Sequence, residues 1–433
     1  MNTLDGSRDE IRLSWPIIDR FAGRFRFTSA AQPNEPALVD VGATNEHIAL
    51  AGRNLDDFVG VPPQDPRVVP AERLAANSDQ IDPQEIVVLM LCGGLSFRSH
   101  GEIHPLKLLQ DPETKESRTL LDRQLDRIAA SPLRKSPSVI AATPMNEEAI
   151  KLHIGGRSSP ETQIRICTGG LAPRLLPYQR ASGPPLVVRE PSGEISYNPT
   201  GHLEALRWLI LSGMLSEFVR SKVIVMASYS NWGRVFDSKM IEIAGFLSRA
   251  AKSDSRLLFL AEVTQRQIEK RKGSILVADS ANPDNLRLVK LSYGQGRPRF
   301  PSESRILMST NTLYFSTTNL LERLRTKAPS SCDLIGSDAV THMLRDAARF
   351  GRRDELSRLF ETSFPVEPHL IPSPSDSPAV FLRAERDLDQ LSLLPESSLM
   401  KPIEVSNDRA VSLKLPGDFE NPAKLRWIFH HET

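Results

Sequence analysis

The sequence predicts an α/β protein with a three-layer, mostly parallel, Rossmann-like core. The run 86–91 is apolar throughout, which is typical of a strand buried on both faces of a sheet. Segments with helical periodicity alternate with strand-like runs from residue 85 to residue 263. The chain has 433 residues, enough for two or three domains and a large core. Together these observations predict a series of βαβ units.

The regular elements follow one another from residue 86. In the predicted helix 118–130, Leu121, Leu125 and Ile128 recur at helical spacing. Asn146 precedes acidic residues at the start of the next helix, a pattern typical of a helix N-cap. The alternation consists of strands at 86–91, 138–142, 163–168, 223–227 and 257–263, and of helices at 118–130, 146–153, 202–211 and 238–251.

The pattern changes beyond residue 273. Three strand-like segments, 274–278, 286–292 and 305–315, follow without intervening helices and predict an antiparallel strand extension of the core. Helices are expected at 317–325 and 337–350, and a Pro/Ser-rich connector at 364–377. The predicted organisation is an N-terminal extension (1–84) packed on a core (85–330), followed by a C-terminal α+β region (331–433).

Composition excludes several classes of protein. Hydrophobic residues make up 40% and charged residues 25% of the chain, and the formal net charge is +1, which gives no sign of a nucleic-acid partner. The 3 cysteines predict a reducing compartment without a disulfide framework. The polar N-terminus does not resemble a signal peptide, and no apolar run reaches membrane-spanning length. We therefore expect a cytoplasmic protein with no membrane partner; a homodimer stays open.

The first candidate site is the segment 92–107, which follows the first predicted strand. Gly93 and Gly94 allow a backbone to approach a phosphate or a base closely. Arg98 and Lys107 would supply positive charge for a triphosphate. Most glycine pairs after a strand form only a tight turn, so the two basic residues are what favours a phosphate site.

Two further segments follow the next two predicted strands. Thr143 to Glu148 contains Asn146, for which a simple helix cap is the favoured interpretation. The segment 167–174 contains Gly169 and Gly170, which form either a turn or part of a base-binding surface. Because the carboxyl ends of parallel strands lie at one edge of a sheet, these segments are expected near Gly93.

The fourth candidate is the stretch 196–233. It places Gly201 and His202 before a predicted helix, and it continues through a buried strand into a loop that contains Asn231 and Gly233. A lone histidine at a helix start is more often a cap or a surface residue than a ligand. Several matching segments in the same order make that simple interpretation less favoured here.

These segments resemble the UDP-glucose pyrophosphorylase family of sugar-1-phosphate nucleotidylyltransferases. The resemblance covers roughly residues 86–321, and it includes 261–264, Lys272-Gly273 and 309–314. It implies a nucleotidyltransferase core that binds a nucleoside triphosphate and a sugar-like 1-phosphate with Mg²⁺, and that releases an NDP-sugar and pyrophosphate. The absence of an Asp-x-Asp motif near 223–227 disfavours a glycosyltransferase.

The resemblance also implies roles for individual residues around the nucleotide. It assigns the base and the ribose to Gly93 and Gly94, the leaving pyrophosphate to Arg98, and the α-phosphate to Lys107. The order of these residues departs from the family signature, because Ser96 replaces a glycine and Leu106 separates Pro105 from Lys107.

On the remaining side, Gly201 and His202 are assigned to the nucleotide. The hydroxyl groups of the sugar are assigned to Asn231, Glu262 and Asn311. These roles are implied by the resemblance alone.

The sequence departs from the family at chemically important positions. Ser230 stands where the family has an acidic Mg²⁺ ligand, so Asp237, or alternatively Glu204, is the expected metal ligand. Thr317 and Thr318 stand near the position of a phosphate-binding lysine, for which Arg323, Arg325 or Lys327 could substitute.

Gly169 stands where the family has a glutamine that reads uracil. Loss of this glutamine favours a base other than uracil, such as guanine. The alternative is that the protein binds uracil and that another group recognises it. Divergent relatives in antibiotic biosynthesis use GTP and cyclitol phosphates such as valienol 1-phosphate. The nucleotide could therefore be GTP or UTP, and the acceptor could be the phosphate of a sugar or of a cyclitol. The alternative function is a catalytically inactive regulatory protein that binds nucleotide or sugar phosphate.

Overall fold

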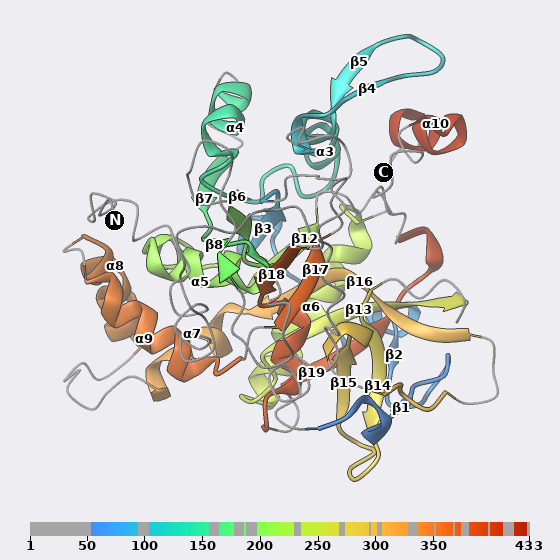
Figure 1. The fold of residues 1–433 in the computed structure, drawn as a ribbon, viewed down its shortest axis with the longest axis vertical. Coiled ribbons are helices and arrows are strands. Elements are labelled where there is room, and N and C mark those ends of the chain that lie inside the picture. Colours follow the sequence, from blue (N-terminus) through green and yellow to red (C-terminus); the bar gives the residue numbers. More distant parts are fainter. Residues whose placement is uncertain are drawn as a thin grey trace.

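The computed structural model shows an α/β fold built around one large sheet (Figure 1). No helix among the described residues is long and apolar enough to cross a membrane. The structure describes residues 53–93, 104–155, 164–176, 186–187, 197–228, 235–267, 273–293, 296–300, 305–327, 337–349, 352–366, 369–373, 381–396, 399–409 and 420–430.

The central sheet has 11 strands and is mostly parallel along its main path. Only β16 is antiparallel to both of its neighbours on this path. In order, the path is β2 (Val69–Pro70), β19 (Met400–Glu404), β13 (Phe259–Gln267), β16 (Arg305–Ser316), β12 (Val223–Ser228), β3 (Ile86–Leu91), β6 (Ser138–Ala142) and β7 (Ile164–Thr168).

Helices cover both faces of this sheet, which makes three layers. Val87 and Leu89 of β3 pack on one face, and Val88 and Met90 pack on the other, because successive side chains of a strand alternate. On the first face lie α5 (Leu203–Leu211), α7 (Thr317–Lys327), α8 (Ser337–Arg349) and α9 (Arg353–Ser363). On the second lie α3 (Leu120–Ala130), α4 (Glu147–Ile154) and α6 (Ser238–Ser253).

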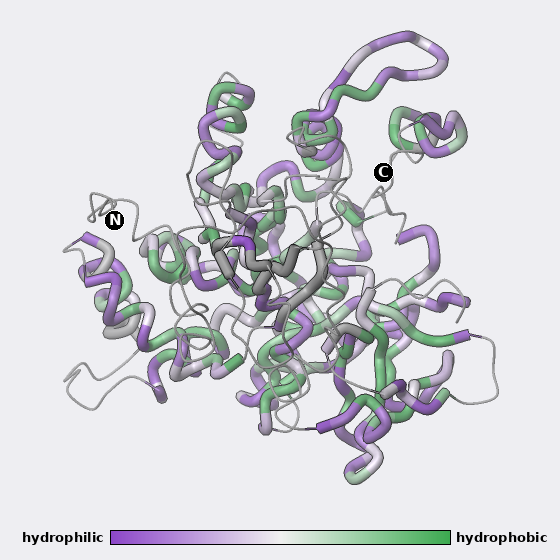
Figure 2. Tube along the Cα trace, in the orientation of Figure 1, coloured by the Kyte–Doolittle hydropathy of each residue, from purple (hydrophilic) through white to green (hydrophobic). Residues whose placement is uncertain are grey.

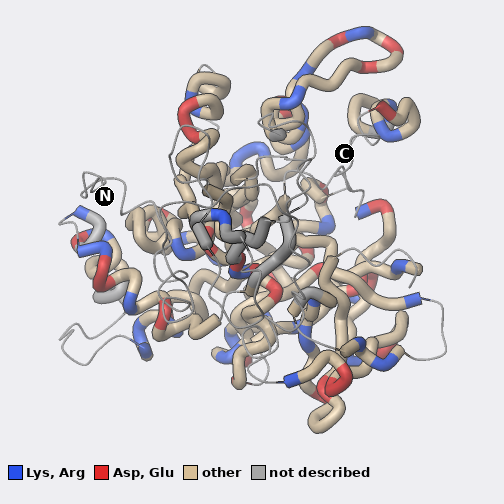
Figure 3. The backbone as a smooth tube through the Cα atoms, in the orientation of Figure 1, with Lys and Arg blue, Asp and Glu red and all other residues tan. Residues whose placement is uncertain are grey.

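These layers confirm the predicted three-layer α/β fold. Most of the surrounding helices carry both hydrophobic and hydrophilic residues along their length, which is typical of helices that cover a sheet (Figure 2). Basic and acidic residues are interspersed along the chain (Figure 3). Most predicted elements lie within a few residues of their expected bounds; the run at 286–292 is the strand β15 (Leu286–Val289) followed by a 3₁₀ turn at Leu291–Tyr293.

The predicted antiparallel extension is also confirmed. β14 (Ile275–Asp279) pairs antiparallel with β15, with β16 and with β1 (Phe58–Gly60). The hairpin of β4 (Leu108–Gln110) and β5 (Ser117–Thr119) projects from the opposite side of the molecule (Figure 1).

The prediction of a connector at 364–377 is wrong in part. β17 (His369–Ser373) pairs antiparallel with β18 (Phe381–Glu385). These two strands form a second sheet together with β9 (Leu175–Leu176) and β10 (Leu186–Val187). The two short segments β8 (Leu171–Pro173) and β11 (Tyr197–Pro199) pair with each other.

Segments from both ends of the chain join the central sheet. β2 comes from the predicted N-terminal extension, and β19 comes from the predicted C-terminal region and pairs parallel with β13. The last described helix is α10 (Pro422–His430). The division into 1–84, 85–330 and 331–433 stays a prediction.

Candidate functional site

The carboxyl ends of four parallel strands bring the predicted motif segments to one edge of the sheet. β3, β6, β7 and β12 run parallel, and Leu91, Ala141, Cys167 and Ser228 occupy neighbouring positions at this edge. This is the edge at which open α/β sheets bind ligands. The strand ends that lead into the motif segments therefore lie side by side as expected, whereas residues 94–103 and 229–234 lie outside the described residues.

Gly93 lies against the loop that follows β6. A Cβ atom at residue 93 would approach Cγ2 of Thr143 to 3.0 Å, and the Thr143 hydroxyl donates to the Gly93 carbonyl at 3.3 Å. The side chain of Asn146 joins the same two loops, because it accepts from the Thr143 amide at 2.9 Å and donates to the Cys92 carbonyl at 2.9 Å.

Asn146 occupies the N-cap position of α4, as predicted, but it is not a simple helix cap. Its side chain makes no capping hydrogen bond to α4, and only 1% of it is exposed. It instead fixes the loop containing Gly93 to the end of β6. A buried amide with these two partners positions the backbone that is expected to face a nucleotide.

Gly169 has a structural reason to be glycine. Its amide donates to the carbonyl of Ala142 at 2.6 Å, and a Cβ atom at this position would lie 3.2 Å from that carbonyl oxygen. The carbonyl of Gly170 accepts from the hydroxyl of Thr200 at 3.1 Å. These contacts fit the turn interpretation of the glycine pair, and the choice of base stays a prediction.

Gly201 makes the closest backbone approach in this region. Its φ is +93°, and a Cβ atom would lie 2.3 Å from the carbonyl oxygen of Arg386. The Arg386 carbonyl accepts from the Leu203 amide at 3.0 Å, and the Arg386 amide donates to the Thr200 carbonyl at 2.9 Å. Only glycine combines this positive φ with so close a neighbour.

The loop at Gly201 is anchored by a buried ion-pair cluster. Arg386 is fully buried and binds Glu204 and Glu361, with Nη1 2.7 Å from the nearer oxygen of Glu361. Burial alone would lower the pKa of Arg386, but the two carboxylates raise it. Glu204, the alternative metal ligand, is thus already paired with a guanidinium. Arg207 adds a second cation, 3.2 Å from Glu204.

His202 lies beside a second group of ionisable side chains. Asp387 interacts electrostatically with His202 and pairs with the ammonium of Lys290. His369 lies 3.4 Å from the Asp387 carboxylate. Burial works to raise the pKa of Asp387, but its interactions with Lys290, His369 and His202 bring it well below its ordinary value. Among the described residues, His369, Glu385 and Asp387 have ligand atoms within 4.8 Å of one another, but the Lys290 ammonium already balances this charge.

Asp237 stands at the start of α6 and has two structural functions. It accepts from the Met240 amide at 3.1 Å, which caps the helix. Both of its oxygens also accept from Nη1 of Arg409 at 2.7 Å. The second guanidinium nitrogen, Nη2, donates to Glu262 at 2.8 Å.

Because a guanidinium already lies between Asp237 and Glu262, the described residues do not fit a resident Mg²⁺ at Asp237. A carboxylate that binds Mg²⁺ uses its oxygens as ligands. Here both oxygens of Asp237 accept hydrogen bonds from Arg409 instead. The predicted Mg²⁺ stays a prediction, without a described ligand.

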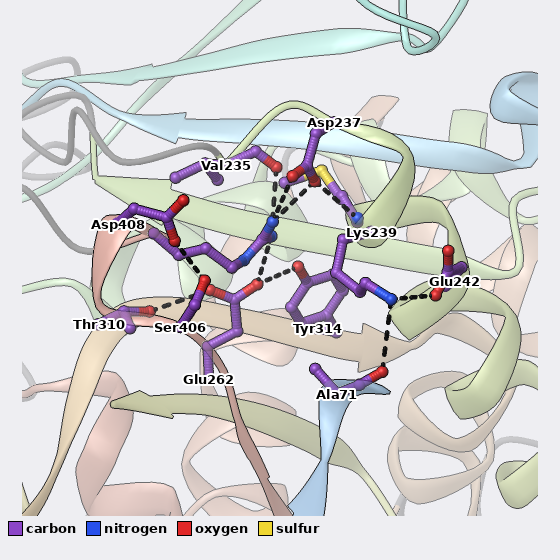
Figure 4. A network of polar contacts seen from close by, with 12 residues as sticks. Ala71, Val235, Asp237, Lys239, Glu242, Glu262, Thr310, Tyr314, Ser406 and Asp408 are labelled. Carbon is purple, nitrogen blue, oxygen red and sulfur yellow. Dashed lines mark hydrogen bonds and ion pairs between the residues drawn. The ribbon is translucent and has the colours of Figure 1, made fainter. Parts of the chain in front are cut away.

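Glu262 is completely buried at the centre of this network (Figure 4). Its Oε1 accepts from the Tyr314 hydroxyl at 2.5 Å, and its Oε2 accepts from the Thr310 hydroxyl at 3.3 Å. Burial raises the pKa of Tyr314, so the phenol keeps its proton and donates. A direct contact between Glu262 and a sugar would require one of these partners to leave. The observed contacts make Glu262 an organiser of its neighbours.

Asn311 has a φ of +61° inside β16. Its backbone amide donates to the Ser309 hydroxyl at 3.1 Å, and its half-buried side-chain amide makes no hydrogen bond with a described residue. The register of β13 and β16 shifts between Ala261 and Val263, opposite this residue. Strained backbone beside a bulge is typical of functional sites.

Of the other predicted residues, Lys107 is described by the structure and four are not. Lys107 is half-buried between a short 3₁₀ turn (His104–Leu106) and β4, and its carbonyl accepts from the Leu120 amide at 3.1 Å. Gly94, Arg98, Ser230 and Asn231 lie outside the described residues.

The position expected for a phosphate-binding lysine lies at the other edge of the sheet. Thr317 is buried, and its amide donates to the carbonyl of Lys222, which precedes β12. Two of the three cations proposed as substitutes have other partners in the structure: Arg323 binds Glu396 at 2.9 Å, and Arg325 binds Glu322.

Sequence reasoning missed the two buried arginines that pair with the predicted metal ligands. Arg386 and Arg409 reach partners 182 and 147 residues away, and no local pattern marks them. The only available signal was the presence of two acidic residues, Asp237 and Glu262, at one edge of the sheet. Two neighbouring carboxylates require a cation.

The fold is similar to solved nucleotide-sugar enzymes. A UDP-glucose pyrophosphorylase mutant from Leishmania major, in complex with UDP-glucose, is 15% identical with a TM-score of 0.57, over 94% of this chain and 77% of that one. A UDP-glucose phosphorylase from Trypanosoma brucei is 15% identical with a TM-score of 0.55, over 85% of this chain and 71% of that one.

A putative UDP-N-acetylglucosamine pyrophosphorylase from Entamoeba histolytica is 12% identical with a TM-score of 0.50, over 80% of both chains. No family model matches the sequence, and no curated protein matches it either. At these identities the similarity establishes a shared fold. It confirms the predicted resemblance to this family at the level of architecture.

Proposed function

We propose that this protein is a nucleotidylyltransferase that makes an NDP-sugar or an NDP-cyclitol and pyrophosphate from a nucleoside triphosphate and a sugar-like 1-phosphate. The observation that carries the proposal is the meeting of the carboxyl ends of β3, β6, β7 and β12, each of which leads into one of the motif segments. Solved structures that share this fold include a UDP-glucose pyrophosphorylase and a putative UDP-N-acetylglucosamine pyrophosphorylase. GTP and UTP are both candidate donors.

The proposed reaction is an in-line displacement. An oxygen of the acceptor phosphate forms a bond to the α-phosphorus, the bond from that phosphorus to the bridging oxygen breaks, and pyrophosphate leaves with the electron pair. Such transfers depend on positioning and on charge neutralisation rather than on covalent catalysis. Lys107 would hold the α-phosphate, and Arg98 would neutralise the pyrophosphate.

The backbone at Gly93 and Gly94 would contact the base and the ribose, and Gly201 and His202 would line the nucleotide side. Asn146 supports this surface because it joins the Cys92 carbonyl to the Thr143 amide. A rigid backbone presents its amides without reorganisation, which is what a nucleotide site requires.

The acceptor would lie over the carboxyl end of β12 and the neighbouring interior positions of β13 and β16, where Glu262 and Asn311 lie. Asn311 would donate to or accept from a hydroxyl of the sugar or cyclitol, together with Asn231. Glu262 would act through its neighbours, because its carboxylate is buried and engaged.

A second candidate function is nucleotide or sugar-phosphate binding without catalysis. It is favoured by the occupation of Asp237 by Arg409 and by the threonine at position 317. Thr317 lacks the charge of the phosphate-binding lysine that the resemblance places near this position, and Ser230 lacks the charge of the acidic metal ligand. The pairing with Arg409 occupies Asp237, the expected substitute for that ligand.

Pyrophosphate release distinguishes the two functions. The purified protein is incubated with Mg²⁺, each of the four nucleoside triphosphates, and a panel of sugar and cyclitol 1-phosphates. Release with one pair identifies the enzyme and its substrates, and Lys107→Ala should then lower kcat at least tenfold, as removal of an electrostatic group does. Nucleotide-dependent thermal stabilisation without turnover would instead support the binding protein.

A further inference from the structure

A buried cationic side chain contacts Glu262, beside the proposed acceptor site. The Arg409 guanidinium lies between Asp237 and Glu262, at 2.7 and 2.8 Å. The side chains of Arg409, Asp237 and Glu262 are 4%, 23% and 0% exposed. Burial alone would lower the pKa of Arg409, but Glu262 and Asp237 hold it well above its ordinary value. The cation is therefore permanent.

The backbone that carries Arg409 is held along β13. The Val405 amide donates to the Val263 carbonyl at 2.8 Å, and the Thr264 hydroxyl donates to Asn407 at 2.8 Å. These contacts follow the parallel pairing of β19 with β13. A planar guanidinium delivered in this way has a fixed orientation, which an ammonium group or a hydrated metal ion would not have.

Arg409 connects to Asn311 through a short chain of hydrogen bonds. Arg409 and Tyr314 fix Oε1 of Glu262, and Thr310 donates to Oε2. The same Thr310 hydroxyl accepts from the Thr312 amide at 3.3 Å. The turn between residues 310 and 312 contains Asn311 with its φ of +61°.

A positive φ at a residue other than glycine persists only where its surroundings enforce it. Thr310 and Thr312 flank Asn311, and both are buried. The carboxylate of Glu262 is the anchor of this turn, and Arg409 is the only described cation bound to that carboxylate.

We propose that Arg409 is a positioning residue that takes the place of a metal ion between Asp237 and Glu262 and holds Asn311 in the conformation that meets the acceptor. The role in acceptor binding rests on the proposed function. The role of Arg409 in holding the turn is independent of the proposed function. The exclusion of a metal ion from this position is independent of it as well.

The kinetic test compares Arg409→Gln, Asn311→Ala and the double variant. Each single change should raise KM for the acceptor about tenfold, the effect of one hydrogen bond, and leave KM for the nucleotide unchanged. The double variant should match the single variants, because both changes remove the same contact. Arg409→Lys should restore little, since an ammonium cannot span both carboxylates. If the effects of the two single changes on KM for the acceptor multiply in the double variant, the proposal is overturned.

A matched control separates this effect from general destabilisation. Arg287 is also buried, and it binds the carbonyl of Leu394 at 2.7 Å. Arg287→Gln should lower the melting temperature without changing KM for the acceptor. The proposal is overturned if Arg409→Gln behaves in the same way.

Two measurements do not depend on turnover. With Arg409 in place, Asn311→Gly should melt at a higher temperature than Asn311→Ala, because alanine is strained at positive φ. That difference should vanish in the Arg409→Gln background, and its persistence would show that Arg409 does not hold the turn.

The metal part is tested with Mn²⁺ as the probe, by electron paramagnetic resonance on the nucleotide-free protein. Wild type and Asp237→Asn should bind Mn²⁺ equally, and loss of a bound Mn²⁺ in the variant would overturn the exclusion. If no substrate pair is turned over, the proposed function fails while the melting and Mn²⁺ experiments still decide this inference.

Discussion

Substitution of Gly201 by alanine tests the backbone packing behind the proposed nucleotide site. The added methyl group would lie 2.3 Å from the carbonyl oxygen and 2.8 Å from the amide nitrogen of Arg386. Both are backbone atoms of a residue that is itself fully buried, so no side-chain rotation can relieve the contact. The φ of +93° is a second, independent source of strain.

The magnitude follows from these two contributions. Left-handed backbone costs a residue with a Cβ atom roughly 1–2 kcal/mol. An added methyl group in a filled site costs about 1–3 kcal/mol. Gly201→Ala should therefore reduce the free energy of unfolding by about 2–5 kcal/mol. Since His202 follows directly, nucleotide affinity should fall as well.

The assay is urea unfolding followed by circular dichroism, with Gly155→Ala as the matched control. Gly155 has an ordinary helical φ of −57°, and its nearest contact for a Cβ atom is 3.3 Å. The control should change stability by less than about 1 kcal/mol. Equal and small effects of the two substitutions would refute the close approach of Gly201 to Arg386.

Three further predictions follow from buried polar groups. Asn146→Ala removes two buried hydrogen bonds and should lower the free energy of unfolding by about 2 kcal/mol, measured by urea unfolding. Glu262→Gln leaves Arg409 with one carboxylate and should cost about 3 kcal/mol in the same assay, whereas an unchanged midpoint would contradict the ion pair. The folded-state pKa of Asp387 lies below its unfolded value, so its pairing with Lys290 stabilises the protein above about pH 4 and loses that effect as pH falls further. Asp387→Asn should therefore lower stability at pH 7 and make it less dependent on pH below 4, and an unaltered acid limb would argue against this assignment.

Local patterns in the sequence were sufficient for the architecture. The strand predicted at 86–91 is β3 itself, because a continuous apolar run is recognisable within a short window. The ordered motif segments also predicted the edge at which the site lies, since strand ends in a parallel sheet share one edge. β17 was missed because Pro372 and its serine-rich surroundings favour a loop, whereas pairing with β18 makes the segment a strand.

What the local sequence could not decide is the charge balance of the site. Asp237 was expected to hold a metal ion because Ser230 stands where the family has an acidic ligand. Its cationic partner, Arg409, is 172 residues away along the chain, so no local pattern indicated the pairing. Gly201 was expected to face a nucleotide, and only the tertiary structure showed that its missing side chain leaves room for the backbone of Arg386.

The physical reason is the same in each case. Periodicity and turn chemistry depend on neighbours within a few residues, so the sequence alone determined the strands, the helices and the edge where the motifs meet. Ion pairs and close backbone contacts depend on which distant segments pack together. Only the tertiary structure therefore decided that two arginines from the C-terminal segments neutralise the carboxylates of the core.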